Sequence, residues 1–191
     1  MTEITKWPMV ILTNYRTGSS AFGVSLRPRR GFNFFGEPAQ DPVKLEKFIN
    51  FYHSGNSEFI LKIMIDQLDD CNLYRSILDS DCHKIRLMRK NEIEQSLSYY
   101  IARTRGVWQQ YIKDSIHSPY TVPIDINNMN WAADIITTNN KKLRESTIEF
   151  DQEYVYENLS IPDSSNFCKI MPPANTNELM AEMTKIVLNK I

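Results

Sequence analysis

Short apolar runs alternate along the chain with longer stretches in which apolar residues recur every three or four positions. Runs of four to seven residues are too short for buried helices, so they predict strands. We expect strands at Met9–Leu12, Glu58–Met64 and Lys84–Met88, and a fourth around Tyr154–Tyr156 that ends at Glu157. The helical spacing predicts helices over Ser19–Leu26, behind Pro42, from Asp66 through Leu73, from Glu92, over Asn127–Ser146 and from Thr176.

This alternation of strands with helices predicts an α/β fold. The central sheet should be mostly parallel, with helices on both faces, and ligands bind such sheets at the carboxyl ends of the strands. The 191 residues suffice for one substantial core, so we expect one domain over residues 1–191.

Lys62 interrupts the second apolar run. Burying an unpaired ammonium group is costly, so a lysine inside a buried strand needs a partner or a route to water. We therefore expect Lys62 either to reach the end of the sheet or to face an anion in a crevice there.

Charge and cysteine content indicate which partners and which cellular compartment suit the protein. The formal net charge is -1, with 22 basic and 23 acidic residues, which favours neither nucleic acid nor an anionic membrane as a partner. The three cysteines, Cys71, Cys82 and Cys168, have no CxxC spacing, which favours a reducing compartment. No run approaches the roughly 20 apolar residues of a membrane span. The sequence therefore predicts a cytoplasmic protein; the oligomeric state is unknown from it.

The first strand leads through a short loop into a helix, in the stretch Met9–Gly23. Backbone N–H groups and the positive end of the helix dipole then point at one place, which suits a phosphate or a sulfate. Arg16 adds a planar, charged donor, and Ser19 and Ser20 add hydroxyl groups. An ordinary strand-to-helix turn explains the same residues equally well. The loop is not a Walker P-loop, because Gly18 is followed by serine and not by lysine.

A second polar group follows the third strand, where Arg89 leaves the strand and Ser98 lies in the next helix. Each alone fits a surface position. Because neighbouring parallel strands end at the same edge, we expect Arg89 to lie beside the first loop.

The combination of these two segments resembles the sulfotransferases that use 3'-phosphoadenosine 5'-phosphosulfate (PAPS). RTGSS is similar to their 5'-phosphosulfate loop, and the segment from Ile85 to Trp108 is similar to the region that holds the 3'-phosphate. The likeness is greatest to small bacterial carbohydrate sulfotransferases of the trehalose-sulfating type. It extends to Gly36–Pro38, Lys62–Met64 and Tyr156–Leu159.

The resemblance implies a P-loop NTPase-like fold and sulfuryl transfer from PAPS to a hydroxyl of a small molecule or a glycan, with 3',5'-adenosine bisphosphate (PAP) as product. It assigns Thr17, Gly18, Ser19 and Ser20 to the 5'-phosphosulfate. Arg16 would bind the cofactor there and neutralise charge on the bridging oxygen, and Arg89 and Ser98 would bind the 3'-phosphate. The scheme requires no metal ion.

The general base is where the chain departs from the family pattern. The position at which the bacterial relatives carry a glutamate is Gln40, which cannot accept a proton. We favour Glu37 as the catalytic base, with Asp41 and His53 as alternatives, because Asp41 already has a helix-capping role. Two other functions stay open: a nucleotide kinase-like phosphotransferase with a degenerate loop, and a non-catalytic nucleotide-binding module that has lost its base.

Overall fold

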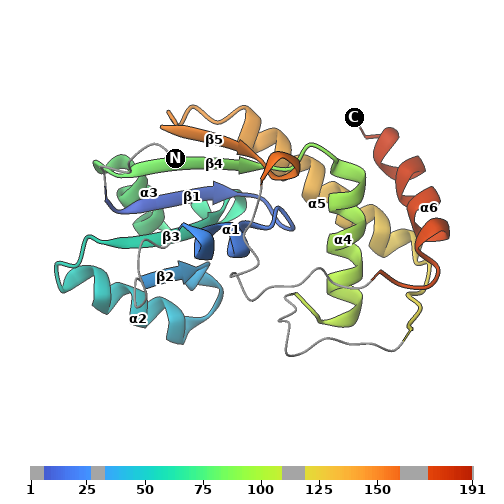
Figure 1. Ribbon diagram of the computed structural model, residues 1–191, viewed down its shortest axis with the longest axis horizontal. Helices are drawn as coiled ribbons and strands as arrows, with labels where there is room; N and C mark the ends of the chain where they lie inside the picture. Colours follow the sequence, from blue (N-terminus) through green and yellow to red (C-terminus); the bar gives the residue numbers. More distant parts are fainter. Residues whose placement is uncertain (1–6, 27–32, 109–118, 160–171, 191) are drawn as a thin grey trace.

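The computed structural model describes residues 7–26, 33–108, 119–159 and 172–190, and five strands in these ranges form one sheet (Figure 1). The sheet order is β2-β3-β1-β4-β5, and every pairing is parallel. The strands are β1 Met9–Thr13, β2 Asn33–Gly36, β3 Phe59–Met64, β4 His83–Met88 and β5 Gln152–Val155. The α/β class predicted from the sequence is confirmed. Cys168 lies outside the described residues.

The central strand β1 is buried along its whole length. Its alternate side chains pack on opposite faces of the sheet, Val10 and Leu12 on one and Met9 and Ile11 on the other. Helices α2 (Pro42–His53) and α3 (Asn72–Asp79) cover the first face, and α1 (Ser19–Ser25) covers the second. Helices on both faces explain why β1 is apolar without polar alternation.

A second group of helices, α4 (Glu92–Arg105), α5 (Ile126–Arg144) and α6 (Thr176–Leu188), packs together beyond the carboxyl ends of the strands (Figure 1). These helices share an apolar cluster that includes Leu97, Ala133 and Met183. The end of α5 also reaches the sheet, where Leu143 joins the core of the first face.

The strand register sets where the loops emerge. Thr13, the last residue of β1, is paired with Met64 near the end of β3 and with Leu87 near the end of β4. The loop after β1 therefore leaves the sheet between two strand ends, at the edge that faces α4 and α5.

Three helix caps follow the expected chemistry, and one does not. The side chains of Asp41, Asn91 and Asp125 accept hydrogen bonds from the first turns of α2, α4 and α5. The sequence also predicts Asn175 as the cap of α6, and Asn175 does occupy the N-cap position, but its side chain accepts no hydrogen bond from the first turn. Its side chain instead pairs with the backbone N–H and C=O of Val122.

Two elements differ from the predictions. The sequence predicts no strand at β2, because four residues ending in Gly36 give too little periodicity to detect. The helix expected from Asp66 through Leu73 is instead a 3-10 turn, η2 (Ile65–Leu68), followed by α3. In the part of the chain that the structure describes, no helix combines the length and the apolar character needed to cross a membrane.

Candidate active site

The loop after β1 is held in place by buried hydrogen bonds. The Thr17 hydroxyl lies 2.6 Å from the Thr13 hydroxyl and donates to the Asn14 carbonyl at 3.0 Å. Asn14 in turn donates to the Ile136 carbonyl at 2.9 Å and to Asn140 Oδ1 at 2.7 Å. The loop is therefore fixed to both the sheet and α5, and the Thr17 side chain faces the core.

Arg16 adopts an unusual backbone conformation in this loop, with φ at 59°. Its guanidinium turns toward α4, where Nε donates to Ser98 Oγ at 2.9 Å and Nη1 donates to the Trp108 carbonyl. Burial, and secondarily the charge of Arg89, hold the pKa of Arg16 below its ordinary value. Arg16 therefore joins the loop directly to the predicted 3'-phosphate residue Ser98.

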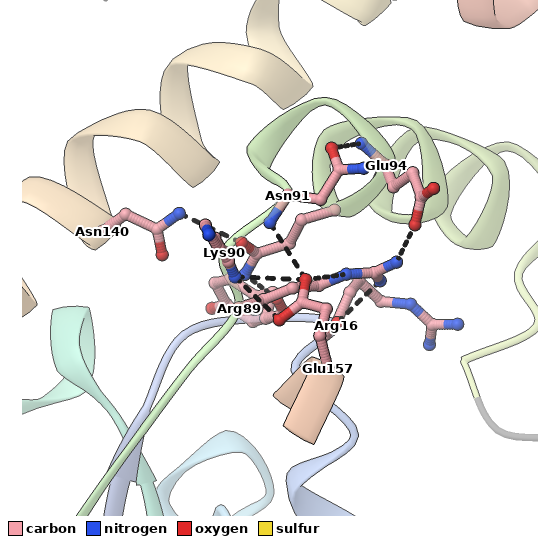
Figure 2. A network of polar contacts seen from close by, with 9 residues as sticks. Arg16, Arg89, Lys90, Asn91, Glu94, Asn140 and Glu157 are labelled. Carbon is pink, nitrogen blue, oxygen red and sulfur yellow. Dashed lines mark hydrogen bonds and ion pairs between the residues drawn. The ribbon is translucent and has the colours of Figure 1, made fainter. Parts of the chain in front are cut away.

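Arg89 lies against the same loop, as the strand order predicts. Its Nη1 donates to the Arg16 carbonyl at 3.3 Å. Its Nη2 bonds Glu94 Oε2 at 2.7 Å, and its Nε lies 3.7 Å from Glu157 Oε1. Figure 2 shows the guanidinium of Arg89 between these two carboxylates, with the Arg16 side chain beside them. Two cations from distant parts of the sequence thus meet at the end of β1.

Glu157, in the 3-10 turn η4 (Tyr156–Asn158), fixes the start of α4. Its carboxylate accepts hydrogen bonds from the backbone N–H of Lys90 at 2.9 Å and of Asn91 at 3.0 Å. Burial opposes its ionisation, but these backbone donors and Arg89 outweigh burial and hold the pKa of Glu157 below its ordinary value of 4.5.

We expect Glu157→Gln to lower the melting temperature at pH 7, with a difference from wild type that shrinks in acid. A carboxyl whose folded-state pKa is depressed stabilises the fold above its unfolded pKa of about 4.5, and this contribution is lost as pH falls further. Melting curves from pH 7 to pH 3, with exposed Glu149→Gln as the control, measure it. A difference that stays constant over this range would contradict the assignment.

Gly18 gives the loop its sharp entry into α1. Its φ is 69°, and a Cβ at this position would lie 2.4 Å from Cε2 of Tyr156. The Tyr156 ring therefore covers the loop, and Arg89 lies 5.1 Å from the centre of that ring. Of the next two residues, Ser19 is buried, and Ser20 is half-buried at the start of a seven-residue helix.

Lys62 supplies a third cation, at the other end of the loop. It lies on the sheet face covered by α1, and its Nζ donates to Ser20 Oγ at 2.9 Å. The same Nζ forms an ion pair with Glu37 in which both side chains are largely buried, and Gln40 donates to the second Glu37 oxygen. The expectation that Lys62 faces an anion is confirmed: the anion is Glu37.

The other candidate bases have different surroundings. Asp41 caps α2 through hydrogen bonds from the backbone of Val43 at 2.9 Å and of Lys44 at 3.4 Å. His53 is the last residue of α2, and at about 1.5 Å per residue it lies roughly 18 Å along the helix from Asp41. The helix returns toward the amino edge of the sheet, where β3 begins. His53 thus lies at the opposite end of α2 from Asp41, and its role as a base stays a prediction.

Backbone strain marks the two residues predicted to be catalytic. In the ranges given above, the non-glycine residues with positive φ are Arg16 at 59° and Glu37 at 53°. Such conformations cost about 1 to 3 kcal/mol and gather at functional sites. Glu37 is held there by a hydrogen bond of 3.0 Å from its own N–H to the Lys62 carbonyl.

Sequence reasoning missed the partners of these residues more than the residues themselves. It gave Glu94 only a capping role beside Asn91, and gave Glu157 only the end of a strand and a place in the resemblance, yet both bind Arg89. It also left open which group pairs with Lys62. The detectable signal was the presence of a lysine in a buried strand.

No known protein-family model matches the chain, and no curated protein sequence matches it. The class that the structure defines is thus an α/β protein with an all-parallel, five-stranded sheet flanked by helices. Its distinguishing feature is a strained loop at the carboxyl edge, with Arg16 and Arg89 at one end and the Lys62–Glu37 pair at the other.

Proposed function

We propose that the protein is a PAPS-dependent sulfotransferase that acts on a hydroxyl of a small-molecule or carbohydrate acceptor. The observation that carries the proposal is the meeting of Arg16 with Ser98 at 2.9 Å and with Arg89 at 3.3 Å. These residues come from the two segments that resemble the cofactor-binding regions of sulfotransferases. A P-loop NTPase-like sulfotransferase fold is part of the same proposal.

The two ends of the loop suit the two anionic ends of the cofactor. Arg89 and Ser98 would bind the 3'-phosphate, with Arg16 beside them, and the backbone of Thr17–Ser20 would bind the 5'-phosphosulfate. The Arg89 contact with Glu94 is the one that a 3'-phosphate would replace, because the Glu94 side chain is 49 % exposed and can turn into solvent. Glu157 would keep Arg89 oriented.

The reaction itself needs positioning and charge neutralisation. The acceptor oxygen attacks sulfur in line, a new S–O bond forms, and the bond between sulfur and the bridging oxygen of the 5'-phosphate breaks, which leaves PAP. Arg16 would neutralise negative charge on that bridging oxygen, and Lys62, at Ser20, would stabilise the transferred group. The acceptor proton would pass to the Glu37 carboxylate.

One observation supports the phosphotransferase alternative. The loop lacks a lysine after Gly18, but Lys62 brings an ammonium group to the same loop from β3. The non-catalytic alternative rests on Gln40, which cannot accept a proton and donates a hydrogen bond to one carboxylate oxygen of Glu37. Both alternatives give distinct results in a transfer assay.

We expect the purified protein to transfer radiolabelled sulfate from PAPS to a hydroxylated acceptor in a mixture of sugars, phenols and alcohols. A parallel reaction with ATP labelled at its γ-phosphate, in the presence of Mg²⁺, should give no labelled acceptor. Transfer from ATP alone would establish the phosphotransferase. Binding of PAP without transfer to any acceptor would establish the nucleotide-binding module.

A further inference from the structure

Three buried amide side chains, Asn14, Gln95 and Asn140, lie around the backbone of Tyr15. Asn14 belongs to the loop after β1, Gln95 to α4 and Asn140 to α5. A primary amide that is removed from water is unfavourable unless its donors and its acceptor find partners. The partners of these three side chains therefore show what the cluster holds in place.

The hydrogen bonds form a closed ring that begins and ends at Tyr15. The Tyr15 N–H donates to Asn14 Oδ1 at 2.7 Å, and Asn14 Nδ2 donates to Asn140 Oδ1 at 2.7 Å. Asn140 Nδ2 donates to Gln95 Oε1 at 3.0 Å, and Gln95 Nε2 donates to the Tyr15 carbonyl at 2.6 Å. Figure 2 shows the Asn140 side chain pointing away from α5, toward the residues of the candidate site. We call Asn14, Asn140 and Gln95, with the Tyr15 backbone, the amide ring.

All four bonds of the amide ring run in the same direction. Each side chain accepts from one neighbour and donates to the next, and hydrogen bonds in such an order polarise one another. Replacing one amide by an apolar side chain would leave a buried donor and a buried acceptor without partners on its two neighbours. Asn14 Nδ2 also donates to the Ile136 carbonyl at 2.9 Å, which anchors the ring to the backbone of α5. The ring therefore fixes the peptide groups on both sides of Tyr15.

The peptide group after Tyr15 is the one from which the φ angle of Arg16 is measured. That angle is 59°, and a strained conformation persists only where the surrounding structure holds it. The ring holds the peptide before Arg16, and Arg89 holds the Arg16 carbonyl at 3.3 Å. The Arg16 guanidinium bonds Ser98, which lies three residues after Gln95 on the same side of α4. One side of α4 thus contacts both the backbone that enters Arg16 and the far end of its side chain.

We propose that Asn14, Gln95 and Asn140 are positioning residues that direct the Arg16 side chain. This inference rests on the proposed sulfotransferase function, in which Arg16 neutralises charge on the bridging oxygen. A donor helps the reaction only when it already points at the place where charge develops. The ring supplies that orientation from the buried side of the loop, and its side chains act on the reaction through Arg16.

The Nε–H signal of Arg16 in ¹H–¹⁵N NMR tests the proposal without any cofactor, because Nε donates to Ser98. Arg75, whose Nε donates to the Leu68 carbonyl at 2.8 Å, is the internal reference, and Arg16→Lys identifies the Arg16 signal. Gln95→Met keeps the bulk of the side chain and removes its amide. We expect the Arg16 signal of this variant to move toward that of a free arginine while the Arg75 signal stays in place.

Two further variants separate orientation from general damage to the fold. Gln95→Glu keeps the acceptor for Asn140, but its carboxylate cannot donate to the Tyr15 carbonyl, so the Arg16 signal should move as in Gln95→Met. Gln67→Met removes a buried amide outside the ring, one that accepts from the Met64 N–H at 3.2 Å. Its Arg16 signal should stay at the wild-type position.

Turnover gives a second, independent measurement. Gln95→Met should lower the rate of sulfate transfer by about 10- to 100-fold, the loss expected when a reacting group is misplaced by about 1 Å. The affinity for PAP should change less than about threefold, because Arg89 and Ser98 remain. Adding Gln95→Met to Arg16→Ala should cause no further loss, since the ring acts through Arg16.

Three outcomes would overturn the proposal. The first is an Arg16 signal that keeps its wild-type position in both folded Gln95 variants. The second is an equal displacement of that signal in Gln67→Met. The third is a loss of turnover in the double variant equal to the product of the two single losses, which would give the ring a structural role alone. Failure of the wild-type protein to bind PAP would instead contradict the proposed function, and the NMR comparison would still decide whether the ring orients Arg16.

Discussion

Replacing Glu37 by glutamine should lower the rate of sulfate transfer by about 10² to 10⁴, with little change in PAP affinity. Glutamine keeps the shape of the side chain but cannot accept the acceptor proton. Glu37 has a strained backbone conformation directly after β2. Its carboxylate pairs with Lys62, and Lys62 in turn donates to Ser20 at the end of the loop. Steady-state kinetics at saturating PAPS, together with calorimetric titration of PAP, measure the two effects separately.

The same substitution should also lower stability, because Lys62 is buried and loses its counter-charge. Removing one partner of a buried ion pair costs about 3 to 5 kcal/mol. The double variant Glu37→Gln, Lys62→Met removes both partners and should regain much of the melting temperature. It should remain inactive although its stability is restored, which would show that the loss of activity does not come from unfolding.

Two matched variants test whether another group is the base. Asp41→Asn should keep near-normal turnover, because asparagine caps a helix about as well as aspartate. His53→Ala should also be active, since His53 lies at the far end of α2. Near-normal turnover in Glu37→Gln together with a collapse in Asp41→Asn would move the base to Asp41.

Arg16→Ala should lower turnover by about 10² to 10³, the usual loss when one donor to a developing charge is removed. The affinity for PAP should fall less, because Arg89 and Ser98 remain. Arg16→Lys should recover only part of the rate, since lysine keeps the charge but lacks the planar fork that reaches both Ser98 and the Trp108 carbonyl.

The backbone of Arg16 permits a second comparison. Glycine adopts positive φ without strain, so Arg16→Gly should be more stable than Arg16→Ala by about 1 kcal/mol, although both lose the side chain. Both should show the same loss of turnover. Equal stability of the two variants would show that φ at this position carries no strain, and normal turnover in either would remove Arg16 from the mechanism. Arg75→Ala, at an exposed arginine paired with Asp69, is the control.

The sequence predicts the strands that bury both faces, because a continuous apolar run has few other structures. The run around β1 is an example. It misses β2, which lies at the edge of the sheet and whose four residues are only partly buried or exposed. It also misplaces the side chain of Asn175, since a tertiary contact with Val122 outweighs the local capping preference.

In the candidate site, too, some contacts can be predicted from the sequence and others cannot. The order of parallel strands is enough to predict that Arg89 meets the Arg16 loop, because both follow adjacent strands. The Lys62–Glu37 pair depends on which face of β3 the lysine occupies and on a strand, β2, that the pattern does not reveal. The placement of Trp108 and Trp131 on Tyr99 depends on how α4 and α5 pack, which periodicity alone does not specify.

The most direct test of the central claim is a calorimetric comparison of PAP with ADP. Each carries two phosphate groups, but only PAP has one on the 3'-hydroxyl, so the pair isolates the proposed site at Arg89 and Ser98. We expect PAP to bind at least about tenfold more tightly than ADP, and Arg89→Ala to remove about 1.5 to 3 kcal/mol of PAP binding while Arg75→Ala removes none. Equal or tighter binding of ADP, or PAP affinity unchanged in Arg89→Ala, would contradict the account.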